Sequence, residues 1–465
     1  MHHVKPNHTS TYRRLVSAGV VAAIALGACS QPASNREPQP LGATPWPVTE
    51  CGTYSGEGCA AIDALVDLDK PSFSNPKTIT NPLYPISELE SVVLLGTVDD
   101  LPFRSETTLL PFTDVVVWNG QAVEVVLVQY MAYSDGRILE IAIDRYAQAD
   151  DGSVWYFGED VYDYRDGTIA LTEGTWLAGR DGQPAMIMPA LPQVGDVYRP
   201  ETIVGIVFEE ITITATDEIK DGPRGPVTDV LVGSELHLDE TRSDKLFAPG
   251  YGEFYSAHDG DVEALALAAG IDGLSDPEPQ ALGAIITAAW GLAEAARLDD
   301  WEAADSIGQR LATAWTDVVD ITPPRIATVM ETSLAELASA LADQDAASAI
   351  QAAVDIAQSA IDVQLRFRPV PMIDIARFHL HTEQLRLDVA NGDSAAAMAE
   401  VAALEWLHQR IALRIPEEAR DHIDSQLEQV RIAAGAGNFA VAADIAARLA
   451  ADLNSVGAGV VDWSA

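Results

Sequence analysis

Between residues 135 and 182, four Asp-Gly pairs begin at Asp135, Asp151, Asp166 and Asp181, at intervals of 16, 15 and 15 residues. The stretches around them, such as AVEVVLVQYMAY and RILEIAIDRYAQA, are rich in β-branched and aromatic residues, which favour strands. Asp-Gly readily adopts the positive φ angles that tight hairpins need. The pattern predicts an antiparallel β-meander domain over residues 91–265. Because such a sheet must protect its edges, we expect a half-barrel or barrel-like shape.

The second half of the chain is rich in alanine and repeats one pattern four times. Each repeat reads as a helix, a short turn, and a second helix that opens with alanines, with apolar residues at three- and four-residue steps. The turns centre near Asp300, Asp345, Asp393 and Asn438, at steps of 45, 48 and 45 residues. This predicts an all-α domain over residues 281–455 with about eight helices in four αα-hairpins, stacked as a bundle or as a short solenoid. Residues 266–280 are the predicted linker and residues 456–465 a C-terminal tail.

The N-terminus has the pattern of an export signal. Arg13 and Arg14 precede an apolar run from Leu15 to Leu26, which is too short for a comfortable membrane span. The run ends in Leu26-Gly27-Ala28-Cys29, which resembles the lipobox of bacterial lipoproteins. That resemblance implies cleavage of residues 1–28 after Ala28 and attachment of a diacylglycerol to the thiol of Cys29. The alternative is an ordinary cleavable signal in which Cys29 is incidental.

By this interpretation the mature protein is lipid-anchored on the extracytoplasmic side, at the cell surface or in the periplasm. Residues 29–50 are rich in proline and polar residues and are predicted to form a flexible spacer. Residues 51–90 follow as a loop-rich lead-in. Cys51 and Cys59 enclose a short glycine-bearing segment, and in an oxidising compartment this spacing favours a local disulfide over a metal site.

The charge of the chain excludes one class of partner. It has 70 acidic and 28 basic residues, a formal net charge of −42. Such a chain repels phosphate backbones, so we expect no nucleic-acid binding. The excess of acids indicates a solvated acidic surface, or weak collective binding of divalent cations.

Motifs of several enzyme classes are missing from the sequence, including the G-x-S-x-G elbow, the Walker loop, the G-x-G-x-x-G loop and H-E-x-x-H. We therefore predict a non-enzymatic protein with no cofactor. One fragment of metal-site type occurs, since Glu405 and His408 are spaced to lie on one helical face. A di-iron site would need a second such pair, which is lacking in these repeats, so an interhelical polar pair is the alternative.

The stretch DGSVWYFGEDVYDYRDG, residues 151–167, concentrates aromatic residues between two Asp-Gly pairs. In a strand, Trp155 and Phe157 point to one face and Val154 and Tyr156 to the other. One face must be core, and the other could line a pocket. The candidate ligand face consists of Trp155, Phe157, Tyr162, Tyr164 and Trp176. The acids of this stretch lack the spacing of an EF-hand calcium loop.

Three segments, DGSVWYFGED, EGTWLAGRDGQPAMIMPALPQVGDVYRPE and LFAPGYGEFYS, resemble a family of uncharacterised secreted bacterial β proteins over about residues 115–258. The resemblance implies an exported sheet domain and no particular activity. We expect a binding or scaffold protein of the cell envelope. Its partners would be the membrane, through its lipid, and a small apolar ligand, an envelope component or a protein. The alternatives are a divalent-metal-responsive surface protein and an envelope hydrolase without a recognisable motif.

Overall fold

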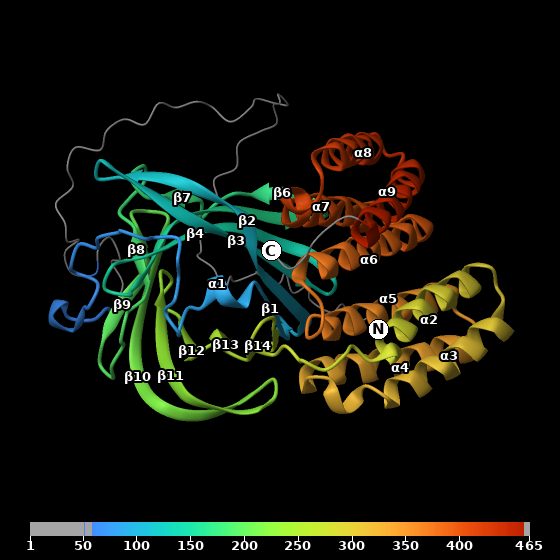
Figure 1. Ribbon diagram of the computed structural model, residues 1–465, viewed down its shortest axis with the longest axis horizontal. Coiled ribbons are helices and arrows are strands. Elements are labelled where there is room, and N and C mark those ends of the chain that lie inside the picture. Colours follow the sequence, from blue (N-terminus) through green and yellow to red (C-terminus); the bar gives the residue numbers. More distant parts are fainter. Residues whose placement is uncertain (1–50, 52–57, 460–465) are drawn as a thin grey trace, which may run out of the picture.

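The computed structural model describes Cys51 and residues 58–459. It confirms the predicted fold class, an antiparallel β-meander followed by helices. The sheet and the helices form two adjoining halves (Figure 1).

Within residues 58–459, a single antiparallel sheet contains all fourteen strands. In chain order they are β1 (Ser91–Val98), β2 (Leu101–Trp118), β3 (Gln121–Ser134), β4 (Arg137–Gln148), β5 (Val154–Arg165), β6 (Thr168–Leu171), β7 (Trp176–Leu177), β8 (Ala185–Met188), β9 (Val197–Ile203), β10 (Val207–Gly222), β11 (Gly225–His237), β12 (Arg242–Ala248), β13 (Gly252–His258) and β14 (Asp261–Ala268).

The first and last strands lie side by side in the middle of the sheet. The hydrogen-bonded order is β6-β5-β4-β3-β2-β1-β14-β13-β12-β11-β10-β9, and β7 and β8 both pair with β5. Two arms therefore extend from the central β1–β14 pair, and they curl toward one another until β8 packs against β9 (Figure 1). Among the described residues the sheet is thus a half-barrel, with β6 and β9 as its two ends.

Tight turns join several neighbouring strands. Asp135-Gly136 and Asp166-Gly167 each place both residues at positive φ, as the predicted two-residue hairpins require. Asn119-Gly120 makes the same turn between β2 and β3. The pair at Asp151 lies in a longer connection, and the pair at Asp181 follows the short strand β7 instead of joining two long strands.

Eight helices form the described part of the C-terminal half. They are α2 (Gln280–Arg297), α3 (Trp301–Thr316), α4 (Pro324–Asp343), α5 (Ala346–Gln364), α6 (Val370–Asn391), α7 (Ser394–Ile411), α8 (Glu417–Gly435) and α9 (Phe439–Gly459), with short 3-10 turns at Val319–Ile321 and Ala412–Arg414. They form the four predicted hairpins, grouped as α2–α5 and α6–α9 (Figure 1). Each group has its own apolar core, and α5 packs against α6 to join them.

Side-chain capping explains the repeated turns. Asp300, Asp345 and Asp393 each precede the second helix of a hairpin and accept hydrogen bonds from backbone N–H groups of its first turn. These N–H groups have no partner within the helix, so an acidic cap fixes where the helix begins. A proline directly precedes the first helix of every hairpin.

The lead-in packs into the concave side of the sheet. Cys51 and Cys59 form a disulfide, with their Cα atoms 5.7 Å apart. Past a 3-10 turn at Ile62–Ala64, the buried pair Arg199–Asp67 fastens the lead-in to β9. The short helix α1 (Ile86–Leu89) then lies between the β2–β4 arm and the β10–β12 arm (Figure 1).

Both faces of the central strands are buried, each against a different layer. On β1, Val92 and Leu94 face the concave side, whereas Val93 and Leu95 pack against the helices. This alternation is the period of two that an extended strand imposes. The sheet therefore separates a concave interior from the helical layer.

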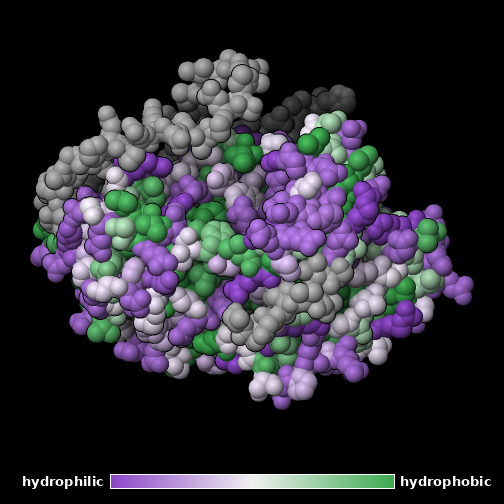
Figure 2. Space-filling model, turned by 45° about the horizontal axis from the view of Figure 1, so that its top comes forward, coloured by the Kyte–Doolittle hydropathy of each residue, from purple (hydrophilic) through white to green (hydrophobic). Residues whose placement is uncertain are grey.

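The outer face of the helices in Figure 2 is mostly hydrophilic, and hydrophobic residues occur on it in small groups. In the described part of the chain, no helix combines the length and the apolar character that crossing a membrane requires.

Candidate functional site

A cavity of about 310 Å³ lies between the concave side of the sheet and the lead-in. This volume is at the lower end of the range of about 300–1,000 Å³ that is typical of small-molecule sites. The lead-in covers it with Tyr84, Pro85, Ile86 and Leu89, while strands from both arms form the wall. The half-barrel thus encloses a space of ligand size.

The wall of this cavity is strongly acidic. Five carboxyl side chains line it, and Lys245 is the one lysine or arginine among the described lining residues. The acids come from five different strands and are Asp144 of β4, Glu209 of β10, Glu235 of β11, Glu253 of β13 and Glu263 of β14. We call these five the acidic wall.

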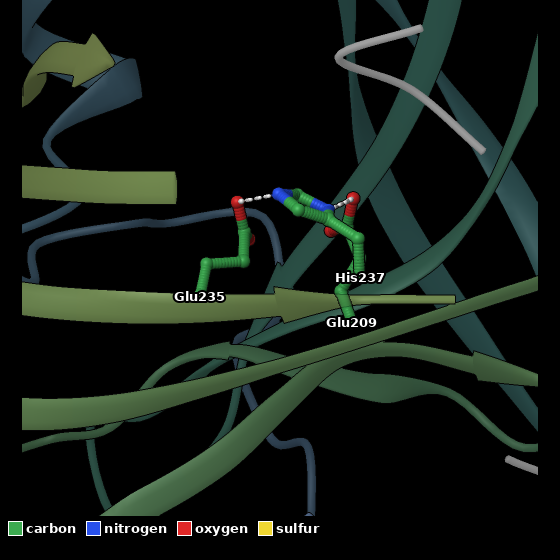
Figure 3. A group of neighbouring side chains, drawn as sticks. All are labelled: Glu209, Glu235 and His237. Carbon is green, nitrogen blue, oxygen red and sulfur yellow. Dashed lines mark ion pairs between the residues drawn. The ribbon is translucent and has the colours of Figure 1, made fainter. Parts of the chain in front are cut away.

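His237 joins two carboxylates of the acidic wall. Its Nδ1 lies 3.7 Å from Oε1 of Glu209, and its Nε2 lies 3.5 Å from Oε2 of Glu235 (Figure 3). The same Nε2 is 2.7 Å from Oγ of Ser243. Burial lowers the pKa of His237, but the two carboxylates outweigh it, so the pKa lies above its usual value. The ring therefore favours the imidazolium form, with each nitrogen facing an acid.

Lys245 places a second cation at the wall. Its Nζ lies 3.0 Å from Oε1 of Glu253 and 3.2 Å from Oε2 of Glu235. Asp144 accepts a hydrogen bond of 2.8 Å from the hydroxyl of Tyr156. In the described part of the chain, neither Asp144 nor Glu263 forms an ion pair within 4.0 Å. The positive groups are therefore gathered at one end of the wall.

Three acids of the wall hold their protons unusually well. Desolvation raises the pKa of Glu235 to about 7 and the pKa of Glu263 to about 7, and it raises the pKa of Asp144 to about 6. A buried carboxylate is costly unless a cation or several hydrogen bonds compensate it. Burial therefore disfavours the charged form of these three acids.

A second buried charge cluster, on the helical side of the sheet, is balanced. Arg104, Arg377 and Arg410 meet Glu106, Asp362 and Asp374, three cations for three acids. Arg104 binds Asp362 through two contacts of 2.6 and 2.8 Å, and Arg410 lies 2.7 Å from Glu106. We call these six residues the interface cluster. The interface cluster thus has no excess of acid.

We predict that the protein loses stability as the pH rises from about 4.5 to about 7. Because the folded-state pKa of Glu263, about 7, lies above the ordinary value of 4.5, the native state binds more protons than the unfolded state in this window. Glu263→Gln should reduce the loss between pH 5 and pH 8 by roughly 2–3 kcal/mol. Urea unfolding at several pH values measures this. Glu124→Gln on the surface is the control, and equal losses in wild type and Glu263→Gln would contradict the assignment.

The predicted aromatic ligand face does not come together as one surface. Trp155, Phe157 and Trp176 are fully buried in the core of the sheet domain. Trp176 donates a 2.5 Å hydrogen bond from Nε1 to Glu201. Tyr162 and Tyr164 instead meet Trp406 of α7, whose Nε1 donates to the hydroxyl of Tyr164 at 2.8 Å. Core packing and helix contact occupy these side chains, so the candidate ligand face is divided.

Glu405 and His408 have separate partners. Glu405 lies 3.7 Å from Arg431, and Nδ1 of His408 lies 3.4 Å from Asp424. No group of three potential metal ligands forms around them in the described residues. Such a group does occur at Glu209, Glu235 and His237, whose ligand atoms lie within 4.8 Å of one another. Ala28 and Cys29 lie outside the described residues.

The acidic wall escaped prediction because its members are far apart in the sequence. Its one local signal is in GSELHLDE, where Glu235 and His237 alternate with apolar residues along a strand. Ser243 and Lys245 show the same two-residue spacing on β12.

A comparison with models of protein families and a comparison with curated proteins both find no match for this chain.

Proposed function

We propose that this chain is a lipid-anchored protein of the cell envelope that binds a small molecule inside its sheet domain. The export signal and the resemblance to a lipobox support the anchor and the extracytoplasmic location. The observation that carries the binding function is the cavity of about 310 Å³, whose wall combines apolar side chains with the acidic wall. Pockets of this composition give a ligand both apolar contact and orientation.

The covering of the cavity by the lead-in supports the same function. Tyr84 packs edge to face on Tyr146, with ring centroids 5.0 Å apart, so the segment before α1 is fixed to β4 by aromatic contact. Gly252 lies against Pro85, and its φ of +70° suits glycine. The lead-in is therefore a built cover, and the spacer that precedes it connects this cover to the proposed lipid.

A cavity-filling variant tests the binding function. Thr107 lines the cavity from β2, and Thr107→Phe would place a ring in the empty space. The full-length Cys29→Ser chain keeps every described residue and avoids detergent. Calorimetry should detect binding of at least one of three six-carbon probes, hexylammonium, hexanol and hexanoate, and Thr107→Phe should abolish it. The proposal fails if no probe binds to the unfilled protein, or if the filled variant binds equally well.

The anchor is tested separately. We predict that the full-length protein incorporates a palmitate analogue and sediments with membranes, and that Cys29→Ser loses both properties essentially completely, because a single sulfur carries the diacylglycerol. Labelling followed by fractionation measures this. The double variant Cys51→Ser/Cys59→Ser removes the other two cysteines and should retain the label. Label remaining on Cys29→Ser would refute the lipoprotein interpretation.

A second candidate function is hydrolysis. Ser243, His237 and Glu209 lie in a line that resembles a Ser-His-acid triad, with Oγ of Ser243 at 2.7 Å from Nε2 of His237. Two features favour binding instead. The raised pKa of His237 holds the ring as an acid rather than a base, and Ser243 lies within a paired strand, where the backbone N–H groups serve the sheet. Labelling of Ser243 by a fluorophosphonate would favour the hydrolase.

A further inference from the structure

We infer that the ligand of this cavity is a small organic cation, a protonated amine with an apolar part of about six carbons. This inference rests on the proposed binding function and adds the class of ligand. The ammonium group would contact the acidic wall on the side of Glu263, and the carbon chain would lie against the apolar remainder of the cavity.

Within the described chain, the acidic wall has two carboxyl groups without a paired cation. Lys245 and His237 compensate Glu235, Glu253 and Glu209, as described above. Asp144 and Glu263 line the same cavity without an ion pair to any described residue. The interface cluster, by contrast, balances its three buried acids with three arginines. A positively charged ligand would supply the missing compensation.

One carboxylate oxygen of the acidic wall also has no hydrogen bond to the described residues. Oε2 of Glu235 is buried and accepts no hydrogen bond of good geometry, although Lys245 and His237 lie near it. Glu235 is only 3% exposed and lines the cavity. Buried polar atoms in proteins nearly always have a partner. Lys245 and His237 already balance the charge of Glu235, so this oxygen points to a hydrogen-bond donor on the ligand and not to a missing cation.

The remaining surface suits the carbon chain of an amine. Apolar side chains line the cavity from the central strands and from α1, and aromatic rings lie among them. They are Ile86, Leu89, Val92, Leu94, Tyr130, Ile211 and Phe247. Apolar contact stabilises a buried chain by about 0.8 kcal/mol per CH₂ group, and aromatic faces attract an ammonium group. A bare metal ion would leave this surface unused.

Lys245 disfavours a divalent metal at Glu209 and Glu235. Nζ of Lys245, 3.2 Å from Glu235, would repel a divalent ion at that carboxylate. An anion would meet five acids and one lysine. The protein's own ammonium at this wall instead shows that it accepts such a group.

The three six-carbon probes test this selectivity, because they share a chain and differ in charge. On the full-length Cys29→Ser protein, calorimetry at pH 7 should give hexylammonium a dissociation constant at least about tenfold lower than that of hexanol, and lower still than that of hexanoate. Equal or tighter binding of hexanol or hexanoate would overturn the cationic ligand while leaving the binding function intact. Absence of binding by all three would contradict the binding function itself.

Matched variants locate the charge. Glu263→Gln should weaken hexylammonium binding by about tenfold and leave hexanol binding unchanged. Glu235→Gln should have the same effect through the second acid, and Glu124→Gln, outside the cavity, should have none. Thermal unfolding checks that each variant is folded. If Glu263→Gln and Glu235→Gln bind hexylammonium like the wild type, or if zinc or calcium chloride binds more tightly than hexylammonium, the assignment is wrong.

Discussion

Arg377→Met is expected to destabilise the protein by about 3–5 kcal/mol, because it leaves the three buried acids of the interface cluster with two cations instead of three. Arg377 is fully buried on α6 and lies within 3.3 Å of all three acids of the interface cluster, which are Glu106, Asp362 and Asp374. Glu106 comes from the sheet and the other two acids from the helices. The variant therefore removes a contact that links the two halves. Urea unfolding followed by circular dichroism measures the change in the free energy of unfolding.

Arg137→Met is the matched control for this prediction. Arg137 also joins the sheet to the helices, through a contact of 2.6 Å with Asp393, but its side chain is 54% exposed. Exposed ion pairs contribute about 0–1 kcal/mol, so the control should change stability little. A loss below about 1 kcal/mol for Arg377→Met would show that the interface cluster does not hold the halves together.

Phe157→Ala is expected to cost about 3–5 kcal/mol, the usual range for removing a buried aromatic ring. Phe157 is completely buried and packs edge to face on Phe73 of the lead-in, with ring centroids 5.3 Å apart, and on Trp118 at 6.4 Å. The ring thus connects three segments of the sheet domain. Loss of it would leave a void that the surrounding rings cannot fill by small shifts. Urea unfolding followed by tryptophan fluorescence measures the loss.

Ile169→Ala is the control for the aromatic variant. Ile169 lies on β6 of the same sheet and is about half exposed, so its truncation should change stability by less than about 1 kcal/mol. If Phe157→Ala were as mild as Ile169→Ala and instead impaired binding of the six-carbon probes, the predicted ligand face would be supported over the core position of this ring.

Local chemistry made the elements predictable. Asp135-Gly136 and Asp166-Gly167 adopt the backbone angles that their residue types favour, and Asp300, Asp345 and Asp393 cap helices where the repeats placed turns. Both signals depend only on residues that are neighbours in the sequence. The prolines before α2, α4, α6 and α8 carry the same kind of information, and they mark the start of each hairpin.

The cavity could not be predicted from neighbouring residues, because it forms only when strands far apart in the sequence pair with one another. Asp144 and Glu263 line one space only because β1 pairs with β14 and brings the two arms of the sheet together. The division of the candidate ligand face could not be predicted from residues 151–167 for a related reason. Alternation along β5 assigns Trp155 and Phe157 to one face, but it does not reveal that the lead-in covers part of the domain and buries both faces.

The proton balance of binding tests the central claim, a cavity with uncompensated acid that accepts a cation. At pH 7, Glu235 and Glu263 are partly protonated, since each has a pKa of about 7. The charges that face them are Lys245, His237, Glu209, Glu253 and Asp261. Hexylammonium should lower both pKa values and release up to about one proton, which titrations in two buffers of different ionisation enthalpy measure. Binding without proton release, or with proton uptake, would contradict the account.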